Sequence, residues 1–147
     1  MTHILSVNPQ SLISKAAEEL KKQDLVKAPE WSQFVKTGRH KMRLPDQSNW
    51  WFYRSAAVLR SIVKLGPIGT EKLRTKYGGL KSRGHKPERF YKGSGSVIRA
   101  ILQQLETSGL IKQTQKGAHK GRVVTPKGTS FLDKLAMQIT KEERKQQ

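Results

Sequence analysis

Residues 49–65 constrain the fold of this chain more than any other segment, because they carry two adjacent apolar stripes at helical spacing. One stripe runs from Trp51 to Leu65 and the other from Phe52 to Val63. Together they are wider than the single stripe of a surface helix. The segment therefore predicts a central helix that packs against neighbours on several sides.

Shorter periodic segments surround this helix. Helices are predicted over 9–23, briefly from Pro29, over 70–77, over 96–108 and from Pro126 onward. Two short strands, 110–115 and 122–125, flank a glycine-marked hairpin loop at 116–121. This order of elements predicts a mainly α, winged-helix-like domain with one short β-hairpin.

The ends of two helices and the segment between them carry local signals. Ser48 is predicted to cap the central helix, and Gly78 to end the 70–77 helix in a left-handed conformation. Residues 78–95 show little periodicity and predict an irregular loop. Irregular loops of this length are uncommon unless they are functional. Ser94 or Ser96 is expected to cap the next helix. The free N–H groups there suit a phosphate, and a plain helix cap is the alternative.

The length of 147 residues fits one domain, expected over 1–140 and followed by a polar tail at 141–147. The chain has no cysteine, which excludes disulfides, zinc fingers and thiol nucleophiles. No apolar run approaches the roughly 20 residues needed to span a bilayer. The N-terminus does not resemble a signal peptide, so a cytoplasmic location is expected.

The charge is strongly positive and unevenly distributed. The chain has 29 Lys and Arg against 11 Asp and Glu, a net charge of +18. Residues 36–92 hold fifteen of these cations and three acids, whereas residues 1–35 are neutral. Solubility requires a net charge of only about 2–8. The excess therefore indicates a polyanionic partner, either a nucleic acid or an anionic membrane.

No arrangement of residues favours catalysis. The four histidines lack a carboxylate or a second histidine at ligand spacing, and no nucleophile or nucleotide-binding motif is present. We therefore predict no enzymatic activity, no metal and no cofactor. Three loops, 38–41, 84–86 and 117–120, instead place a glycine near a histidine and a lysine. Such loops suit phosphates and unstacked bases, and exposed turns without a ligand are the alternative.

The aromatic residues divide into two groups. Core positions are predicted for Trp31, Trp51, Phe52 and Phe131, and either stacking or packing for Trp50, Tyr53, Phe90 and Tyr91.

Four stretches of the chain resemble one family of ribosomal proteins. Residues 50–60, 76–79, 89–96 and 121–128 are similar to motifs of small-subunit ribosomal protein nineteen of the archaeal and eukaryotic series, and residues 29–31 and 38–45 resemble its archaeal branch. The resemblance implies a winged-helix-like domain in the head of the small subunit. It further implies binding to the 3′ major domain of the rRNA, contact with other small-subunit proteins and a role in subunit maturation. We expect the free protein to be a monomer.

Matching the motifs implies RNA contacts for Arg54, Arg60 and Arg99, while Ala100 replaces a basic residue common in the family. With the basic loops added, the predicted RNA-binding residues are Arg54, Arg60, Lys64, Lys36, Arg39, His40, Lys41, Arg43, Lys76, Lys81, Arg83, His85, Lys86, Arg89, Lys92, Ser94, Arg99, Lys116, His119, Lys120 and Arg122. The main alternative is a winged-helix transcriptional regulator that places the 96–108 helix in a DNA major groove. A third interpretation is binding to an anionic membrane, which requires an amphipathic helix with a free apolar face.

Overall fold

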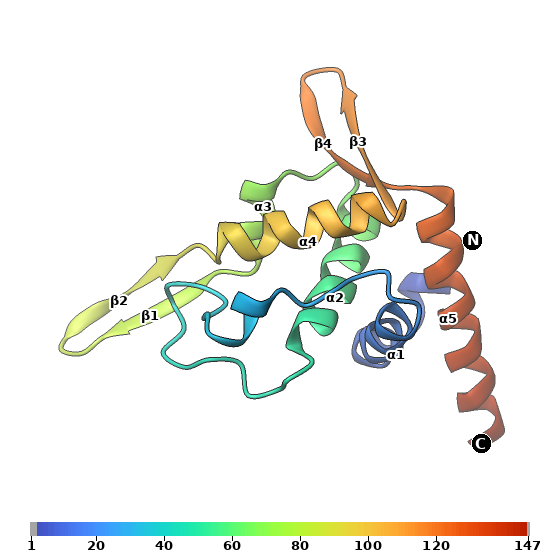
Figure 1. The fold of residues 1–147 in the computed structure, drawn as a ribbon, viewed down its shortest axis with the longest axis horizontal. Helices are drawn as coiled ribbons and strands as arrows, with labels where there is room; N and C mark the ends of the chain where they lie inside the picture. Colours follow the sequence, from blue (N-terminus) through green and yellow to red (C-terminus); the bar gives the residue numbers. More distant parts are fainter. Residues whose placement is uncertain (1–2, 147) are drawn as a thin grey trace.

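The computed structural model describes residues 3–146 as a mainly helical, winged-helix-like fold, which confirms the predicted fold class (Figure 1). Its helices are α1 (Pro9–Lys22), α2 (Trp50–Leu65), α3 (Thr70–Lys76), α4 (Gly95–Thr107) and α5 (Pro126–Gln146). Two short 3-10 helices, η1 (His3–Leu5) and η2 (Glu30–Gln33), complete the helical part. The strands are β1 (Gly79–Arg83), β2 (Lys86–Tyr91), β3 (Ile111–Lys116) and β4 (His119–Val124).

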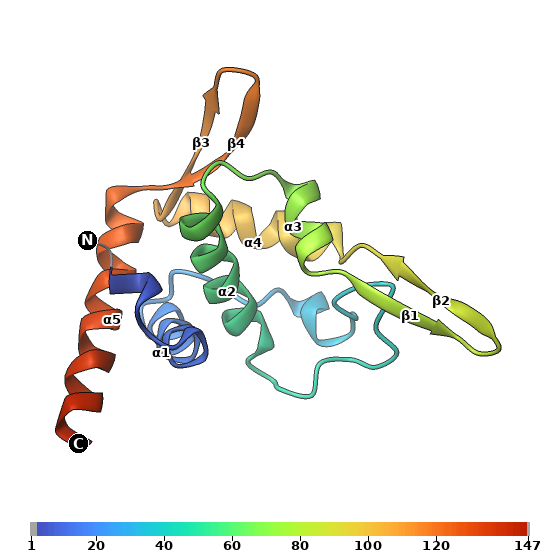
Figure 2. The same cartoon turned by 180° about the vertical axis from the view of Figure 1, so that it is seen from behind.

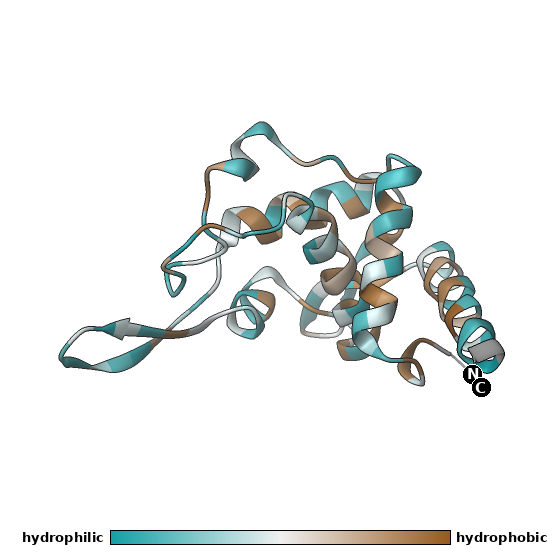
Figure 3. Ribbon diagram, turned by 90° about the horizontal axis from the view of Figure 1, so that it is seen from below, coloured by the Kyte–Doolittle hydropathy of each residue, from teal (hydrophilic) through white to brown (hydrophobic). Residues whose placement is uncertain are grey.

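The core surrounds α2, as the two stripes of that helix predict. Figure 2 shows α2 between α1 and α3, with α4 crossing behind it and α5 beyond α1. Trp51 on α2 is fully buried, and its indole N–H donates a hydrogen bond to the Gln104 side chain of α4 at 3.0 Å. Figure 3 shows hydrophobic residues on the helices, whereas the far end of the β1–β2 hairpin is hydrophilic.

Three of the aromatic residues predicted for the core are less buried than expected. Trp31 remains 39% exposed and only its ring edge meets Trp51, with the two ring centroids 5.4 Å apart. Phe52 and Phe131 are half-buried at the margin of the core. Trp51 alone among these four is a fully enclosed core residue.

The predicted helix caps are partly correct. Ser94 caps α4, because its hydroxyl oxygen accepts a hydrogen bond from the Val97 N–H at 3.4 Å. Ser48 does not cap α2. Asn49 occupies that position, and its side chain accepts a hydrogen bond from Lys21 of α1 rather than from the helix backbone.

The prediction of an irregular loop at 78–95 is wrong, because these residues form the antiparallel β1–β2 hairpin. Gly84, with φ +72°, makes its turn, and Leu80 pairs with Phe90 across the strands. Both faces of this hairpin meet solvent along most of its length, so no apolar alternation marks it in the sequence. Gly78 is not left-handed. A Cβ at Gly78 would lie 2.5 Å from the Tyr91 carbonyl oxygen, which explains the glycine by close packing.

The second hairpin, the wing, is tighter than predicted. Its strands extend to the pair Lys116–His119, and the turn contains two residues, of which Gly117 has φ +60°. The expected loop at 116–121 is therefore mostly strand, because backbone pairing continues where side-chain alternation stops. Beyond the wing, α5 continues to Gln146, so residues 141–146, expected as a tail, are helical.

Candidate nucleic-acid interface

Two of the three basic side chains of α2 are partly packed against the body of the protein. Arg54 and Arg60 are half-buried, and Lys64 is exposed. The guanidinium of Arg54 stacks over the Tyr77 ring, 4.5 Å from the ring centroid. Burial lowers the pKa of Arg54, and the Arg60 Nε is buried without a hydrogen-bond partner. Neither arginine forms an ion pair within residues 3–146, so both carry charge that the described chain does not neutralise.

Arg54, Arg60 and Lys64 form, together with Lys76, the α2 cluster. Tyr77, at the end of α3, contacts this cluster. Its hydroxyl lies 3.0 Å from the Ser61 hydroxyl of α2, and the Lys76 ammonium donates to the same Ser61 oxygen at 2.8 Å. Burial raises the pKa of Tyr77. Burial, followed by the nearby charges of Lys64 and Arg60, lowers the pKa of Lys76. Both causes disfavour the charged form of Lys76, so an external anion placed here would stabilise the cluster.

A second cluster joins the loop at 36–43 to the base of the β1–β2 hairpin. Gly38 pairs with Gly93 as an isolated β-bridge, and the Ser94 N–H donates to the Thr37 carbonyl at 2.9 Å. The Arg39 guanidinium lies 4.7 Å from the Tyr91 ring centroid, and the Lys81 ammonium lies 5.9 Å from the same centroid. Two cations therefore lie within cation–π distance of the Tyr91 ring.

His40 is a packing residue as well as a predicted RNA contact. Cβ atoms built at Gly38 and Gly79 would lie 2.7 Å and 3.0 Å from its ring, so only glycines fit beside it. Burial lowers the pKa of His40, and the charges of Lys41 and Arg54 lower it further. The ring is therefore neutral near pH 7, and its Nδ1 is buried without a partner.

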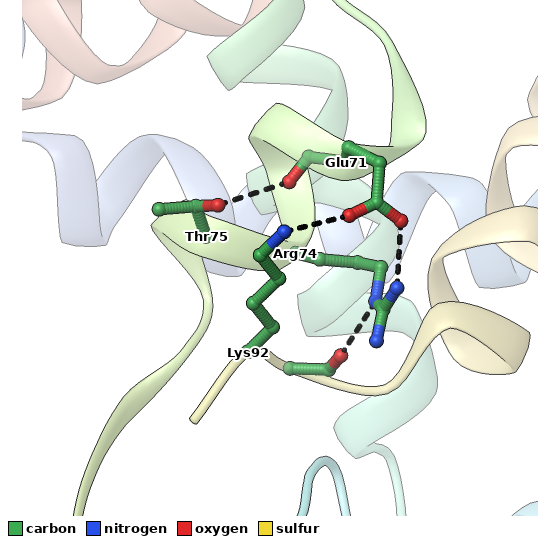
Figure 4. A network of polar contacts seen from close by, with 5 residues as sticks. Glu71, Arg74, Thr75 and Lys92 are labelled. Atoms are coloured by element: carbon green, nitrogen blue, oxygen red, sulfur yellow. Dashed lines mark hydrogen bonds and ion pairs between the residues drawn. The ribbon is translucent and has the colours of Figure 1, made fainter. Parts of the chain in front are cut away.

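Several predicted contacts are used inside the protein. Figure 4 shows Lys92 and Arg74 on either side of Glu71, at 3.0 Å and 2.6 Å from its carboxylate oxygens. Arg122 lies 3.4 Å from Glu106, and Ser94 caps α4. Among the predicted residues whose side chains are described, Lys92 and Arg122 are the ones that form ion pairs. The other predicted Lys and Arg residues whose side chains are described form no ion pair within residues 3–146.

The exposed residues among the predicted contacts divide between two projections and the body. His85, Lys86 and Arg89 are exposed on the β1–β2 hairpin, and Arg83 donates a hydrogen bond to the Pro87 carbonyl near its tip. The wing projects in a different direction and exposes His119 and Lys120, while the Lys116 side chain lies outside the described residues (Figure 1). Outside the two hairpins, the exposed predicted Lys and Arg residues are Lys36, Arg39, Lys41, Arg43, Lys64, Lys76, Lys92 and Arg99.

Sequence reasoning overlooked the residues that organise these clusters. Tyr77 and Ser61 carry no charge, and Arg74 was not distinguished from the other cations of its helix. The stacking signal was present for Tyr91, which adjoins cations in the sequence, but Tyr77 meets Arg54 only through the packing of α3 on α2. Such pairs become visible only in three dimensions.

Two other kinds of site would involve a metal ion or a membrane. Residues 3–146 contain no group of three metal-ligating side chains, and no helix there is long and apolar enough to cross a bilayer. Uncompensated cations next to aromatic rings instead suit a polyanion whose bases can stack.

Comparisons with known proteins agree on one family. A family profile described as "Ribosomal protein S19e" matches residues 3–142. Small ribosomal subunit protein eS19 of Aeropyrum pernix is 46% identical over 144 residues, which cover 97% of this chain and 92% of the relative. The protein of the same name from Haloarcula marismortui is 37% identical over 92% of this chain and 90% of the relative. The protein eS19G of Ascaris suum is 38% identical over 97% of this chain and 95% of the relative.

Proposed function

Because the chain belongs to the S19e family of small-subunit ribosomal proteins, we propose that it binds small-subunit rRNA through the two cationic clusters and the β1–β2 hairpin. Membership in this family agrees with the expected ribosomal, non-catalytic role. The observation that carries the proposal is the pair of half-buried arginines on α2, Arg54 and Arg60, which lack a counter-charge in the described chain. Phosphates of folded RNA would supply that charge.

The proposal extends to the place and purpose of binding. The site is the 3′ major domain of the rRNA, in the head of the subunit, beside other small-subunit proteins, and binding supports assembly and maturation of the subunit. Recognition is by shape and phosphate contacts rather than by sequence, because the cations are spread over several elements instead of forming a row on one recognition helix.

The structure also weakens the DNA-binding alternative. Gln104 of α4, one of the side chains expected to read bases, accepts a hydrogen bond from Trp51 and donates one to the Lys27 carbonyl at 2.7 Å. It is therefore committed to holding the core together. Arg99 and Gln103 are the exposed readers that remain on this helix, which is too few for a specific half-site.

Charge reversal on α2 tests the proposal. Because Arg54 and Arg60 are half-buried, the exposed Lys64 is the better choice, and Lys64→Glu leaves the packing intact. We expect this variant to bind a transcript of the 3′ major domain more weakly, with a smaller salt dependence, and to be depleted from small subunits on a sucrose gradient. The matched control is Lys134→Glu on α5, which is also exposed, forms no ion pair in the described chain and lies outside the clusters. Equal incorporation of both variants contradicts the proposed surface, and a preference for duplex DNA contradicts RNA binding itself.

A further inference from the structure

One hollow of the described surface adjoins the α2 cluster. It is a groove of about 640 Å³ between α1, the loop at 41–47 and the first turns of α2. Its size falls in the range of small-ligand sites and suffices for one nucleotide.

Aromatic rings form one wall of the groove. Trp50 and Tyr53 from α2 line it together with the stacked Arg54–Tyr77 pair. The Trp50 ring is held edge-on against buried Trp51, with centroids 5.3 Å apart, so its position is fixed. The Tyr53 ring is half-buried, and its hydroxyl has no hydrogen-bond partner within residues 3–146. Fixed rings and a guanidinium plane are the surfaces on which unstacked bases bind.

The rim of the groove is cationic and unpaired. Lys41, Arg43 and Arg54 line it, and Asp46 is the one acidic residue among the lining side chains. None of the four forms an ion pair with another residue of the described chain. The side chains of Gln10 and Gln47 also line the groove and have no hydrogen-bond partner there. The groove therefore combines anion attraction, a stacking wall and free hydrogen-bonding groups.

We infer that this groove holds a single unstacked nucleotide of the bound RNA. The base lies against the Tyr53 wall, and its phosphate meets Arg54 and the cations of the 41–43 loop. Gln10 and Gln47 are placed to contact the edge of the base. The inference rests on the proposed RNA binding and adds to it one contact that reads an extruded nucleotide instead of phosphates alone.

A protein segment fits the groove less well. Acidic side chains would match the cations, but they would leave the aromatic wall without a planar partner. An apolar segment would bury Lys41 and Arg43 without a counter-charge, which is unfavourable. A nucleotide satisfies the ring wall and the cations together.

The test compares two RNA hairpins that differ by one unpaired nucleotide. Both have the same 20 base pairs, and one carries a single 2-aminopurine bulge. The full-length protein is titrated against each RNA by fluorescence anisotropy, and stacking is followed by quenching of the 2-aminopurine. We expect about tenfold tighter binding of the bulged RNA, with quenching, because an unpaired base can stack on an aromatic side chain.

Three variants locate the effect. Tyr53→Ala should abolish both the preference for the bulge and the quenching. Tyr53→Phe keeps the ring and should retain both, and it guards against a loss of folding in the alanine variant. Lys64→Ala, on α2 but not among the groove-lining residues, should weaken binding to both RNAs equally.

The outcomes separate this inference from the proposed function. Equal affinity of the wild-type protein for the two RNAs, or a bulge preference that survives Tyr53→Ala, overturns the nucleotide site and leaves RNA binding standing. Failure of the wild-type protein to bind either RNA contradicts the proposed function and the nucleotide site with it.

Discussion

The two β-hairpins are built alike and attached differently. Each has short antiparallel strands and a turn with a left-handed glycine, Gly84 in one and Gly117 in the other. The wing starts from core residues, because Ile111 is 2% exposed and Ile68 pairs with Arg122 as a β-bridge. The β1–β2 hairpin has no fully buried residue in either strand. The wing is therefore part of the body, whereas the β1–β2 hairpin only adjoins it.

This difference assigns separate roles to the hairpins. A two-stranded ribbon is marginally stable alone and needs packing against another element. The wing obtains this packing from the core. The β1–β2 hairpin obtains it at its base, from Arg39 over Tyr91 and from the Glu71 network. The wing should therefore be rigid in the free protein, whereas the β1–β2 hairpin should become fully ordered only on the proposed RNA.

The largest contrast is expected from removing one apolar side chain from each hairpin. Ile111→Ala should lower the free energy of unfolding by about 3 kcal/mol, because it opens a cavity in the core. Leu80→Ala, at a side chain that is 62% exposed, should change it by less than about 0.5 kcal/mol. Urea denaturation followed by circular dichroism measures both. Equal losses would show that the β1–β2 hairpin is as firmly packed as the wing.

A smaller effect is expected from crowding the attachment of the wing. A Cβ at Gly121 would lie 2.7 Å from the Ile68 backbone nitrogen, so Gly121→Ala must push the wing away from the body. We expect a loss of about 2 kcal/mol, typical of overpacking. Gly69→Ala is the control, because no atom lies within 4 Å of that Cβ and the backbone there is not left-handed. An unchanged stability of Gly121→Ala would mean that the wing is not clamped to Ile68.

The same contrast explains how much of the fold the sequence could predict. Helices were predicted within one or two residues where apolar spacing is strong, as in 49–65 against the observed Trp50–Leu65. The wing was found because its strands begin at core residues. The 79–91 hairpin was missed for two reasons. Its exposed strands show no alternation of apolar and polar residues, and Pro87 argues against a strand unless the strand lies at an edge.

The sequence predicts which segments of the candidate site are cationic, but not which of these cations contact other side chains of the protein. Clusters of Lys and Arg in the sequence identified the cationic segments. Nothing in one dimension indicated that Lys92 would be neutralised by Glu71, twenty-one residues away, or that Tyr77 would support Arg54. Such pairing depends on which helices pack together, and it decides which cations remain available to an RNA.

A modest local effect is expected at the base of the β1–β2 hairpin. Arg39→Ala removes the guanidinium from the Tyr91 ring, a contact worth about 0.5–1 kcal/mol. Global stability should hardly change, but the β1 and β2 amides should exchange hydrogen faster, while those of β3 and β4 should not. Tyr91→Phe keeps a ring under the cation and serves as the control. Equal acceleration in both hairpins would contradict a local role.

The smallest effect is expected from the Glu71 network, which ties the exit of the β1–β2 hairpin to α3. Hydrogen bonds from Lys92 and then from Arg74 lower the pKa of the exposed Glu71 carboxyl below its ordinary value. The stabilisation by this contact is therefore complete above the ordinary glutamate pKa and is lost as the pH falls through the lowered value.

The Gly93 amide, which donates to the Arg74 carbonyl at 2.8 Å, is a reporter for this loss. In an NMR titration its chemical shift should move with a midpoint below that of an ordinary glutamate. This transition should be absent in Glu71→Gln and persist in Glu88→Gln, whose carboxylate on β2 forms no ion pair in the described chain. A midpoint at or above the ordinary glutamate value would mean that Glu71 does not hold the hairpin. The attachment would then rest on Arg39 and the Gly38–Gly93 bridge.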